Sequence, residues 1–486
     1  MTGLLTNTYF LIIVGYFAFV IAISFLTKKV ASRSVADYLV AGRNLGVLFC
    51  AVVVASEWLG GMSTIGVSEK AFTKLSFEPV LYNVSTAIGM LIIGFTVAKH
   101  YRRNNVHTVS EMIEKIIGKE AKKISAIAFL IAYIVLSYVQ LQTATSVITA
   151  VFKVNLLAAT IIAAAVITLY TYIGGMHALA VTSVIHFTVM FLGIGTAMFI
   201  GLSQIGGFLG LQETLTDNAA TVGKTIGNIY NPFSVSFSAA MALVVGGVFG
   251  GMAAQASIQP IFAAKNETTA KKAAVLSSVF IAPFGIMTAV LGLIAATGKF
   301  IPTDTTAKLA LTTLLTNPEF IHPAFGGIAL AAIMAAILST VGPVNFAVVT
   351  IATKDIYHGF INPKADEQKV LKMAKNLVIL VCLITIPLAY FMSAGILDTA
   401  YISYAIRAIG AIVILVGIYA RGWLSMPGVK IAFIGGTIAV FICVIAEKYE
   451  WFKLDKTYGA IIFAVASLII GYVIENGFSL RKKSKL

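Results

Sequence analysis

Apolar runs of roughly twenty residues, separated by short polar segments, recur along the whole chain. A helix of about 20 residues matches the ~30 Å hydrocarbon core of a bilayer. The pattern therefore predicts an all-α, multi-pass membrane protein with about 13 transmembrane helices. The runs lie near residues 8–27, 46–71, 76–99, 124–152, 155–173, 178–202, 236–263, 272–298, 324–353, 371–394, 400–420, 428–446 and 459–476.

The composition supports a membrane protein and excludes several other classes. Of the 486 residues, 59% are hydrophobic and only 11% are charged, whereas about a quarter of the residues of a soluble domain are charged. The three cysteines lie inside apolar runs and the six histidines show no ligand spacing, so we expect neither a disulfide framework nor a zinc cluster. The first run, about Thr8 to Phe25, lacks the basic start and the small-residue cleavage site of a signal peptide, which indicates a retained helix.

Basic residues are distributed unevenly between alternate connecting segments. Because positive segments stay on the cytoplasmic side, the N-terminus is expected outside and the C-terminus inside, in the cytoplasmic membrane of a bacterium or archaeon. The net charge of +15 is then explained by loops that face anionic lipid, and nucleic-acid binding is a poor second explanation. Most of the 35 Lys and Arg residues fall in segments 28–45, 99–123, 264–273, 354–375, 421–430 and the C-terminal tail.

Polar and flexible residues interrupt the second run, LFCAVVVASEWLGGMSTIG. Paired glycines inside a membrane helix indicate a break, and the carbonyls freed there are tolerated in the bilayer only where they line a cavity or bind something. Close helix packing through small residues is the alternative. The interrupting residues are Ser56, Glu57, Gly60, Gly61, Ser63 and Thr64.

The seventh run, LVVGGVFGGMAAQASIQP, combines paired glycines with Gln255 and Gln259 in a similar way. Interrupted helices at matching places in two halves of a chain are typical of inverted-repeat transporters. Counting five spans from each interruption predicts a five-plus-five core with broken first and sixth helices. The expected domains are an extra helix and loop at 1–45, a first repeat at 46–202, an external loop at 203–235, a second repeat at 236–421, and two helices with a cytoplasmic tail at 422–486.

The run IMAAILSTVGPVN (333–345) places two adjacent hydroxyls, Ser339 and Thr340, beside the helix-weakening pair Gly342 and Pro343. Neutral oxygens suit a weakly held alkali cation such as Na⁺, whereas Ca²⁺ and Mg²⁺ need negatively charged ligands. The alternative is that each hydroxyl bonds back to a carbonyl four residues earlier in its own helix. Spacing alone leaves both interpretations open.

Arg407 stands alone in the apolar run YISYAIRAIGAIVILVG, four residues after Ser403 on the same helical face. An Arg inside a membrane needs a partner or a wet cavity. Three roles remain open: bidentate binding of a substrate carboxylate, an ion pair with Glu57, or a structural cation whose head group reaches the interface.

Four segments together resemble the sodium:solute symporter family. LYTYIGGMHA (169–178) matches a family signature that ends in Gly-Gly, and DYLVAGRNLG (37–46) is similar to the entry into the family's first core helix. QPIFAAKNETTAKKA (259–273) and STVGPVN…TKDIY (339–357) fall where the family has related segments. The resemblance covers nearly the whole chain, and it implies thirteen or more helices with a five-plus-five inverted repeat.

The resemblance also implies binding sites. In such symporters a sodium ion lies between the break in the first core helix and the eighth core helix. The carried-over ligands are the carbonyls of Ser56, Leu59 and Ala336 and the hydroxyls of Ser339 and Thr340. Phe72 supports this register, and a slip by one residue to Ala55 and Trp58 is the alternative. The expected solute contacts are Glu57, Gly60, Ser63, Tyr82, Gln255, Ser403 and Arg407.

Two departures from the family pattern bear on coupling. Some members bind a second sodium ion through an Asp in the helix after the Gly-Gly motif and hydroxyls just past the Ser-Thr pair. This chain has Ser183 at the first position and Gly342 and Pro343 at the others, so we expect one Na⁺ per solute. Pro260 stands where members often have an Arg, so an inner-gate role of that Arg is not carried over.

These observations predict a Na⁺-coupled symporter, and not an enzyme, that imports a small organic solute by alternating access. An amino acid or another zwitterion or carboxylate is favoured as solute. The expected partners are the solute, Na⁺ as coupling ion and the lipid bilayer, with a monomer as the functional unit. The alternative is a proton-coupled or uncoupled carrier with Glu57 as titrating group. A sensor would need a larger cytoplasmic domain than the tail LRKKSKL, and a channel would need repeated pore-lining rings that the chain does not show.

Overall fold

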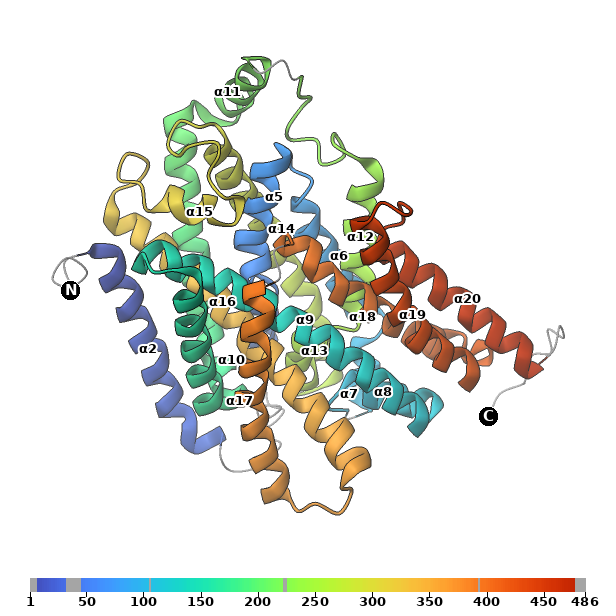
Figure 1. Ribbon diagram of the computed structural model, residues 1–486. Coiled ribbons are helices and arrows are strands. Elements are labelled where there is room, and N and C mark those ends of the chain that lie inside the picture. The colour runs from blue at the N-terminus through green and yellow to red at the C-terminus, as the bar shows by residue number, and fades with distance from the viewer. Residues whose placement is uncertain (1–6, 32–44, 105, 222–224, 392–393, 477–486) are drawn as a thin grey trace.

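The computed structural model is built from helices throughout the residues that it describes, which are 7–31, 45–104, 106–221, 225–391 and 394–476 (Figure 1). The side chains of residues 27–31 and 173–180 are not described. The expectations that concern DYLVAGRNLG before Leu45, the tail LRKKSKL and the Gly-Gly side-chain environment at 174–175 therefore lie outside the described residues.

Helices of membrane-spanning length confirm the multi-pass, all-α fold class. Nine helical segments in the described part of the chain are long and apolar enough to cross a bilayer, and two bent pairs raise this number to eleven. The shorter apolar segments Val80–Phe95 and Leu156–Tyr172 lie at two further predicted spans, while the count of thirteen stays a prediction. The helices are α2 (Thr8–Ala31), α4 (Val47–Trp58), η2 (Met62–Gly66), α5 (Val67–Lys74), α6 (Val80–Phe95), α7 (Ala98–Arg103), α8 (Val109–Ile117), α9 (Lys119–Phe152), α10 (Leu156–Ile205), α11 (Gly207–Thr221), α12 (Phe237–Met252), α13 (Gln255–Phe262), α14 (Glu267–Ala296), α15 (Ala307–Leu315), α16 (Pro323–Thr350), η3 (Ile351–Ile361), α17 (Glu367–Phe391), α18 (Ile396–Tyr419), η4 (Arg421–Trp423), α19 (Met426–Lys448) and α20 (Lys456–Asn476).

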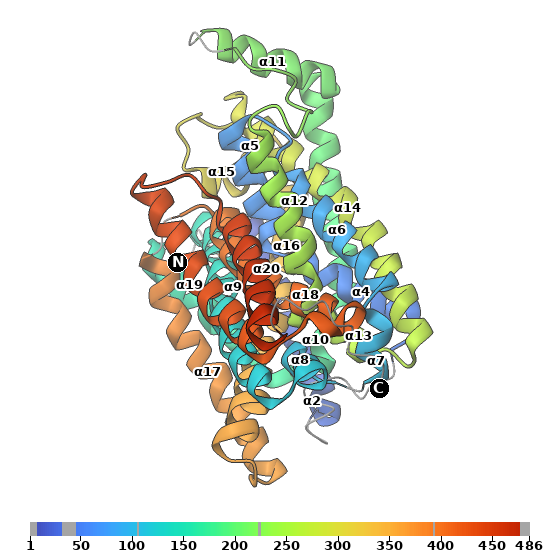
Figure 2. The same ribbon diagram turned by 90° about the vertical axis from the view of Figure 1, so that its right-hand side faces the viewer.

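Several helices extend beyond the apolar runs that predicted them. α9 begins at Lys119, and the helical run that starts with α16 continues through the π-helix η3 to Ile361. Hydropathy marks only the part of a helix that suits hydrocarbon, whereas the backbone hydrogen bonds continue into polar sequence. For the same reason α11 is a helix inside the predicted external loop, where it projects at one end of the molecule (Figure 2).

Both predicted helix breaks are present. The chain bends by 56° between Val47–Trp58 and Met62–Lys74, and by 41° between Phe237–Met252 and Gln255–Phe262. The first break falls at the predicted glycine pair, whereas the second falls on two alanines, 253 and 254. The second set of glycines serves packing instead, because a Cβ on Gly250 would lie 2.7 Å from the carbonyl oxygen of Tyr404.

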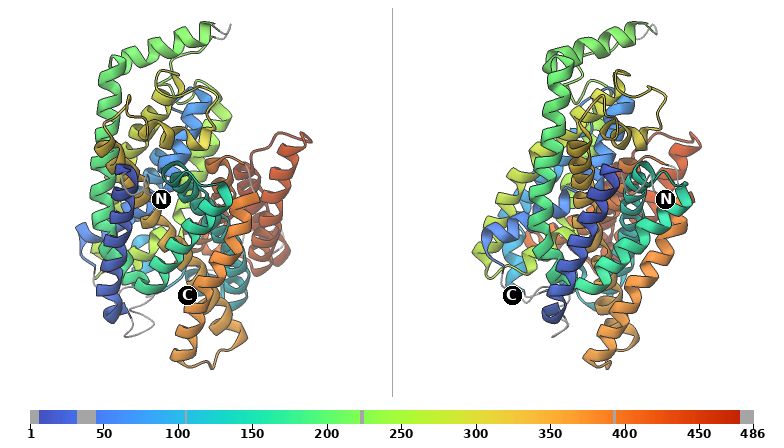
Figure 3. Two further views of the ribbon diagram at one scale, coloured as in Figure 1. Left: turned by 60° about the vertical axis from the view of Figure 1, so that its left-hand side comes forward. Right: turned by 90° about the vertical axis from the view of Figure 1, so that its left-hand side faces the viewer.

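The helices form two groups around the breaks. α6 packs against both α12 and α14, while α16 packs against α9 and α10, and α18 lies between α9 and α12. α19 and α20 pack together on one edge of the molecule, seen face-on in Figure 2. α2 lies at the opposite edge, against α10 and α16 (Figure 3). Leu59, Ala253 and Ala254 at the two breaks are fully buried, so the free backbone groups there are shielded from lipid.

Candidate functional site

Ser339 and Thr340 connect α16 to the broken end of α4. Ser339 Oγ lies 2.7 Å from the carbonyl oxygen of Ser56, and Thr340 Oγ1 lies 2.5 Å from that of Glu57. Both hydroxyls also approach the carbonyl oxygen of Ala336, at 2.8 and 3.2 Å. The hydroxyls thus bond back within their own helix and, at the same time, reach a second helix more than 280 positions away in sequence.

This arrangement has more acceptors than protons. Each hydroxyl has one proton to donate, yet each faces two carbonyl oxygens. α4 contributes carbonyls that a continuing helix would have used, because the helix stops at Trp58. The five neutral oxygens, connected by these contacts, form a ligand set suited to an alkali cation and poor for Ca²⁺ or Mg²⁺. The residues fit a Na⁺ ion, and their role as its ligands stays a prediction.

Four of the five predicted sodium ligands meet here: Ser56, Ala336, Ser339 and Thr340. The carbonyl of Glu57 makes the contact that the resemblance assigns to Leu59. Leu59 is buried and donates its amide to the carbonyl oxygen of Ala55 at 3.0 Å. The alternative ligand Trp58 accepts a hydrogen bond through its carbonyl from Ser63 Oγ at 2.9 Å.

The glycine pair lets the break approach its neighbours closely. A Cβ on Gly60 would lie 2.1 Å from Thr340 Oγ1, and a Cβ on Gly61 would lie 2.1 Å from Thr143 Oγ1. Real side chains do not tolerate such distances, so only glycine brings the backbone this near to α16 and α9. The two glycines therefore allow the backbone at the break to contact Thr340.

Gln140 on α9 is a polar residue near the break that the sequence interpretation missed. Its Oε1 accepts the amide proton of Gly61 at 3.1 Å, which satisfies a backbone donor freed by the break. Its Nε2 has no hydrogen-bond partner among the described residues. A Gln in the middle of the apolar stretch IVLSYVQLQ was the available signal.

Arg407 is enclosed by aromatic side chains on α18 and α9. Its guanidinium carbon lies 4.2 Å from the ring centre of Tyr404 and 5.5 Å from that of Tyr133. Nη1 donates to the hydroxyl of Tyr133 at 3.4 Å, while Nε and Nη2 have no partner among the described residues. Only 2% of Arg407 is exposed, so its head group does not reach an interface.

Glu57 faces the start of α13 and not Arg407. Its carboxylate accepts a hydrogen bond from the hydroxyl of Ser257, in the first turn of α13. The amide of Ala256, next to it, donates to Tyr133 at 3.1 Å. Both helix breaks and the Arg407 environment are thereby joined through Glu57 and Tyr133, and no direct hydrogen bond joins Glu57 to Arg407.

Further predicted solute residues lie around this centre. The hydroxyls of Tyr82 and Tyr404 are 2.8 Å apart. Ser403 is buried, and its hydroxyl has no partner among the described residues, as is also true of the indole nitrogen of Trp58. Ser63 is linked to the neighbouring helix α6, because its hydroxyl accepts from Asn83 Nδ2 at 3.1 Å.

Gln255, another predicted solute contact, is hydrogen-bonded to the backbone near the start of α8. Its Oε1 accepts from the amide of Val109 at 2.7 Å, and its Nε2 donates to the carbonyl of His107 at 2.9 Å. Both partners belong to the connection between α7 and α8, so the structure does not bring the Gln255 amide together with Arg407.

A family model identifies the family of this chain, and solved structures share its fold. The model of the sodium:solute symporter family matches residues 38–428. A sodium/glucose cotransporter of Vibrio parahaemolyticus is 26% identical over 390 residues, which cover 74% of this chain and 69% of the relative. Among solved structures, a Na⁺-coupled sialic acid symporter in a substrate-bound, outward-open state matches with a TM-score of 0.80 at 16% identity, over 98% of this chain and 99% of that one. Mhp1, a nucleobase-cation-symport-1 family transporter in a closed conformation, matches with a TM-score of 0.59 at 13% identity, over 91% and 96%. At such identities the solved structures establish the fold alone.

Proposed function

Because this chain belongs to the sodium:solute symporter family, a family of Na⁺-coupled solute transporters, we propose that it imports a small carboxylate-bearing solute together with one Na⁺. An amino acid or another zwitterion is the favoured solute. We place the protein in the cytoplasmic membrane of a bacterium or archaeon, with its N-terminus outside and its C-terminus inside.

The unpartnered donors of Arg407 carry the proposal for the solute. A guanidinium that is 2% exposed and leaves Nε and Nη2 without acceptors is costly to bury. A carboxylate fits this edge of the guanidinium with two parallel hydrogen bonds. Trp58 Nε1 and Ser403 Oγ, also without partners, are further groups for a polar solute at the same centre.

The oxygens of Ser56, Glu57, Ala336, Ser339 and Thr340 would hold the Na⁺. They come from α4 and α16, which belong to the two helix groups that move relative to each other in alternating access. A cation shared between them favours the arrangement in which both sets of oxygens are close together. Its loss to the cytoplasm would then favour separation of the helix groups and release of the solute.

Energetics favour a zwitterion over a simple anion. One Na⁺ that moves down a ~10-fold gradient releases ~1.4 kcal/mol, and a ~100 mV potential adds ~2.3 kcal/mol for each charge moved. A neutral or zwitterionic solute uses both, which suffices for roughly 500-fold accumulation. A monoanion cancels the moved charge and keeps only the ~10-fold term.

A direct test compares carboxylates with their neutral analogues. Uptake of labelled amino acids and hydroxy acids is measured in inside-negative membrane vesicles, with each acid and its amide as competitors. We expect competition by the acid and little by the amide, because the amide has no negative charge and replaces one of the two acceptor oxygens with an NH₂ donor. Equal competition by both would refute carboxylate recognition.

The alternative is a proton-coupled or uncoupled carrier with Glu57 as titrating group. Replacement of Na⁺ by choline at fixed pH distinguishes this alternative from the proposed Na⁺ coupling. The proposal expects uptake to fall to the background and a proton gradient not to restore it. Undiminished uptake in choline would instead support the alternative.

A further inference from the structure

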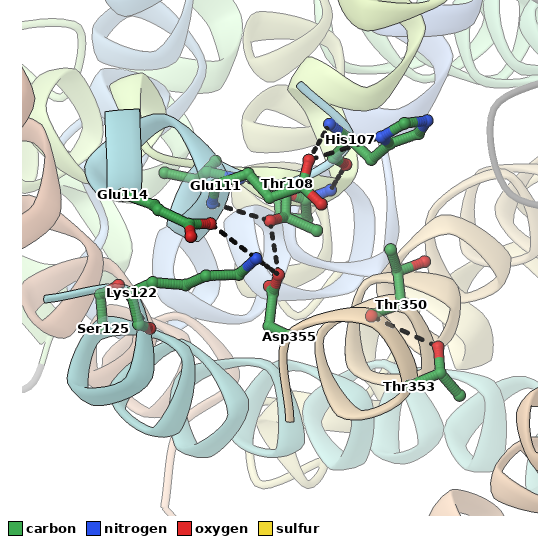
Figure 4. Close-up of polar contacts among 11 residues, drawn as sticks. His107, Thr108, Glu111, Glu114, Lys122, Ser125, Thr350, Thr353 and Asp355 are labelled. Atoms are coloured by element: carbon green, nitrogen blue, oxygen red, sulfur yellow. Dashed lines mark hydrogen bonds and ion pairs between the residues drawn. The ribbon is translucent and has the colours of Figure 1, made fainter. Parts of the chain in front are cut away.

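The connection between α7 and α8 is held from two sides at one end of the molecule. Gln255 of α13 binds the backbone on both sides of Thr108, through Val109 N at 2.7 Å and His107 O at 2.9 Å. Thr108 Oγ1 donates to Asp355 Oδ1 of η3 at 3.0 Å (Figure 4). One short segment thus connects the second half of a broken helix to the end of the helix that carries Ser339 and Thr340.

The turn around Thr108 is ordered by its own hydrogen bonds. Thr108 caps α8, since its Oγ1 accepts the amide of Glu111 at 3.0 Å. The Glu111 carboxylate accepts the amide of His107 at 2.6 Å and lies 3.4 Å from the His107 ring. Burial opposes ionisation of Glu111, but the bonds from His107 outweigh it and lower its pKa to about 2. The segment therefore presents the Thr108 hydroxyl to Asp355 in a fixed position.

The burial of the Asp355 side chain depends on these contacts. The side chain is fully buried, and its Oδ2 has no hydrogen-bond partner among the described residues. Besides Thr108, it has Lys122 Nζ of α9 at 3.7 Å, and Lys122 is itself 2.8 Å from Glu114 of α8 (Figure 4). A buried carboxylate with so few partners is stable only while Thr108 and Lys122 stay in place.

Cavities are present at both ends of the molecule. The one beside α8, of about 450 Å³, lies at the end of α8 opposite to Thr108, and its lining includes Glu114, Gly118 and Leu424. At the opposite end of the molecule, a cavity of about 390 Å³ lies between α5, α9, α15 and α17, and Glu69, Thr145, Lys308 and Tyr390 are among its lining residues. α5, α11 and α15 mark this end in Figure 1, whereas α7 and α8 lie toward the other end. The α7–α8 end carries the basic segment 99–123 and is the predicted cytoplasmic side.

We propose that Thr108 and Asp355 form a latch that closes the cytoplasmic side of the transporter and must open for release of the solute. This inference rests on the proposed Na⁺-coupled function and adds gating residues outside the Na⁺ and solute sites. Asp355 lies fifteen positions after Thr340 in one helical run, Pro323–Ile361, which corresponds to about 22 Å. Na⁺ at Thr340 and the latch at Asp355 therefore favour the same position of this helix.

Na⁺ binding and closure of the latch are expected to be thermodynamically coupled, so the latch can be tested through the apparent Na⁺ affinity. If Na⁺ binds best to the latched state, a broken latch lowers the apparent Na⁺ affinity without change to the Na⁺ ligands. Thr108→Asp is the sharpest variant, because Asp preserves the helix cap but removes the hydroxyl that donates to Asp355. Thr108→Ser is the matched control, because it keeps the cap and the donor.

The experiment uses the full chain with Cys50, Cys382 and Cys443 replaced by Ala and a reporter Ser110→Cys, which lies buried in α8. Inside-out vesicles receive a membrane-impermeant maleimide, with Na⁺ titrated against choline. We expect Thr108→Asp to react at least about tenfold faster than the parent without Na⁺, and to need about fivefold more Na⁺ for half-protection. Thr108→Ser should match the parent.

Reaction of Thr108→Asp at the parental rate, in the absence of Na⁺, would overturn the latch. If Na⁺ does not change the labelling rate of the parent protein, this result would count against sodium coupling. The labelling rates of the parent and of Thr108→Asp without Na⁺ would still test the latch. A second experiment applies if Thr108→Asp does not fold. Thr108→Cys is combined with Asp355→Cys, and the two cysteines are bridged by a short cleavable bis-thiol reagent. The bridged protein should retain thermal stabilisation by Na⁺. Loss of that stabilisation on bridging would also overturn the proposal.

Discussion

Removal of the Thr340 hydroxyl should weaken apparent Na⁺ affinity by roughly 5- to 150-fold. Thr340 Oγ1 is one of five neutral oxygens, and its contact with the carbonyl of Glu57, at 2.5 Å, is the shortest that joins α16 to the break. Loss of one partner of a buried charged group costs about 1–3 kcal/mol. Since 1.4 kcal/mol corresponds to a factor of ten, this range is roughly 5- to 150-fold. Ser339→Ala removes an equivalent oxygen and should have a similar effect.

The assay is the Na⁺ dependence of uptake, supported by Na⁺-dependent thermal stabilisation of the purified protein. Thr340→Ser keeps the oxygen and should stay within about twofold of the parent. Ser277→Ala is a matched control, because the Ser277 hydroxyl is buried and bonds to the carbonyl of Ala274 in its own helix. If Thr340→Ala and Ser339→Ala both retain the parental Na⁺ dependence, the hydroxyls only stabilise helix packing and the proposed Na⁺ site is wrong.

Three further results are expected. Arg407→Ala should impair solute binding more than Na⁺ binding, and its losses should be less than additive with those of Glu57→Gln because Tyr133 and the start of α13 connect the two residues; fully additive losses would show that they act independently. Gly60→Ala should reduce Na⁺-dependent uptake more than tenfold, because its new Cβ would lie 2.1 Å from Thr340 Oγ1, and uptake at the parental level would disprove the close approach. Reversal potentials of reconstituted protein should give one Na⁺ per solute with a Hill coefficient near one, since Ser183 provides no carboxylate for a second ion; a ratio of two would require another site.

The sequence alone determined the class of the molecule, the position of its first break and the helix that contains the second. Apolar runs of bilayer length indicate membrane helices whatever their neighbours are, because the bilayer sets their length. The glycine pair at Gly60 and Gly61 indicated the first break for a similarly local reason, since residues without Cβ weaken a helix wherever they occur. At the second break, the local signal found the right helix but not the right residues, because Gly250 packs against α18.

Only the tertiary structure decided how polar groups from distant helices pair. Ser339 and Thr340 had equally good partners within their own helix, and their reach to α4 depends on how two helices far apart in sequence are packed. The same holds for Arg407, whose hydrogen bond to Tyr133 depends on how α18 packs against α9. Hydropathy and spacing describe one helix at a time, whereas a carbonyl freed at a break accepts whichever donor the packed neighbour presents. The contacts behind the proposed ligand set and the proposed latch are therefore properties of the packing and could not be predicted from the sequence pattern alone.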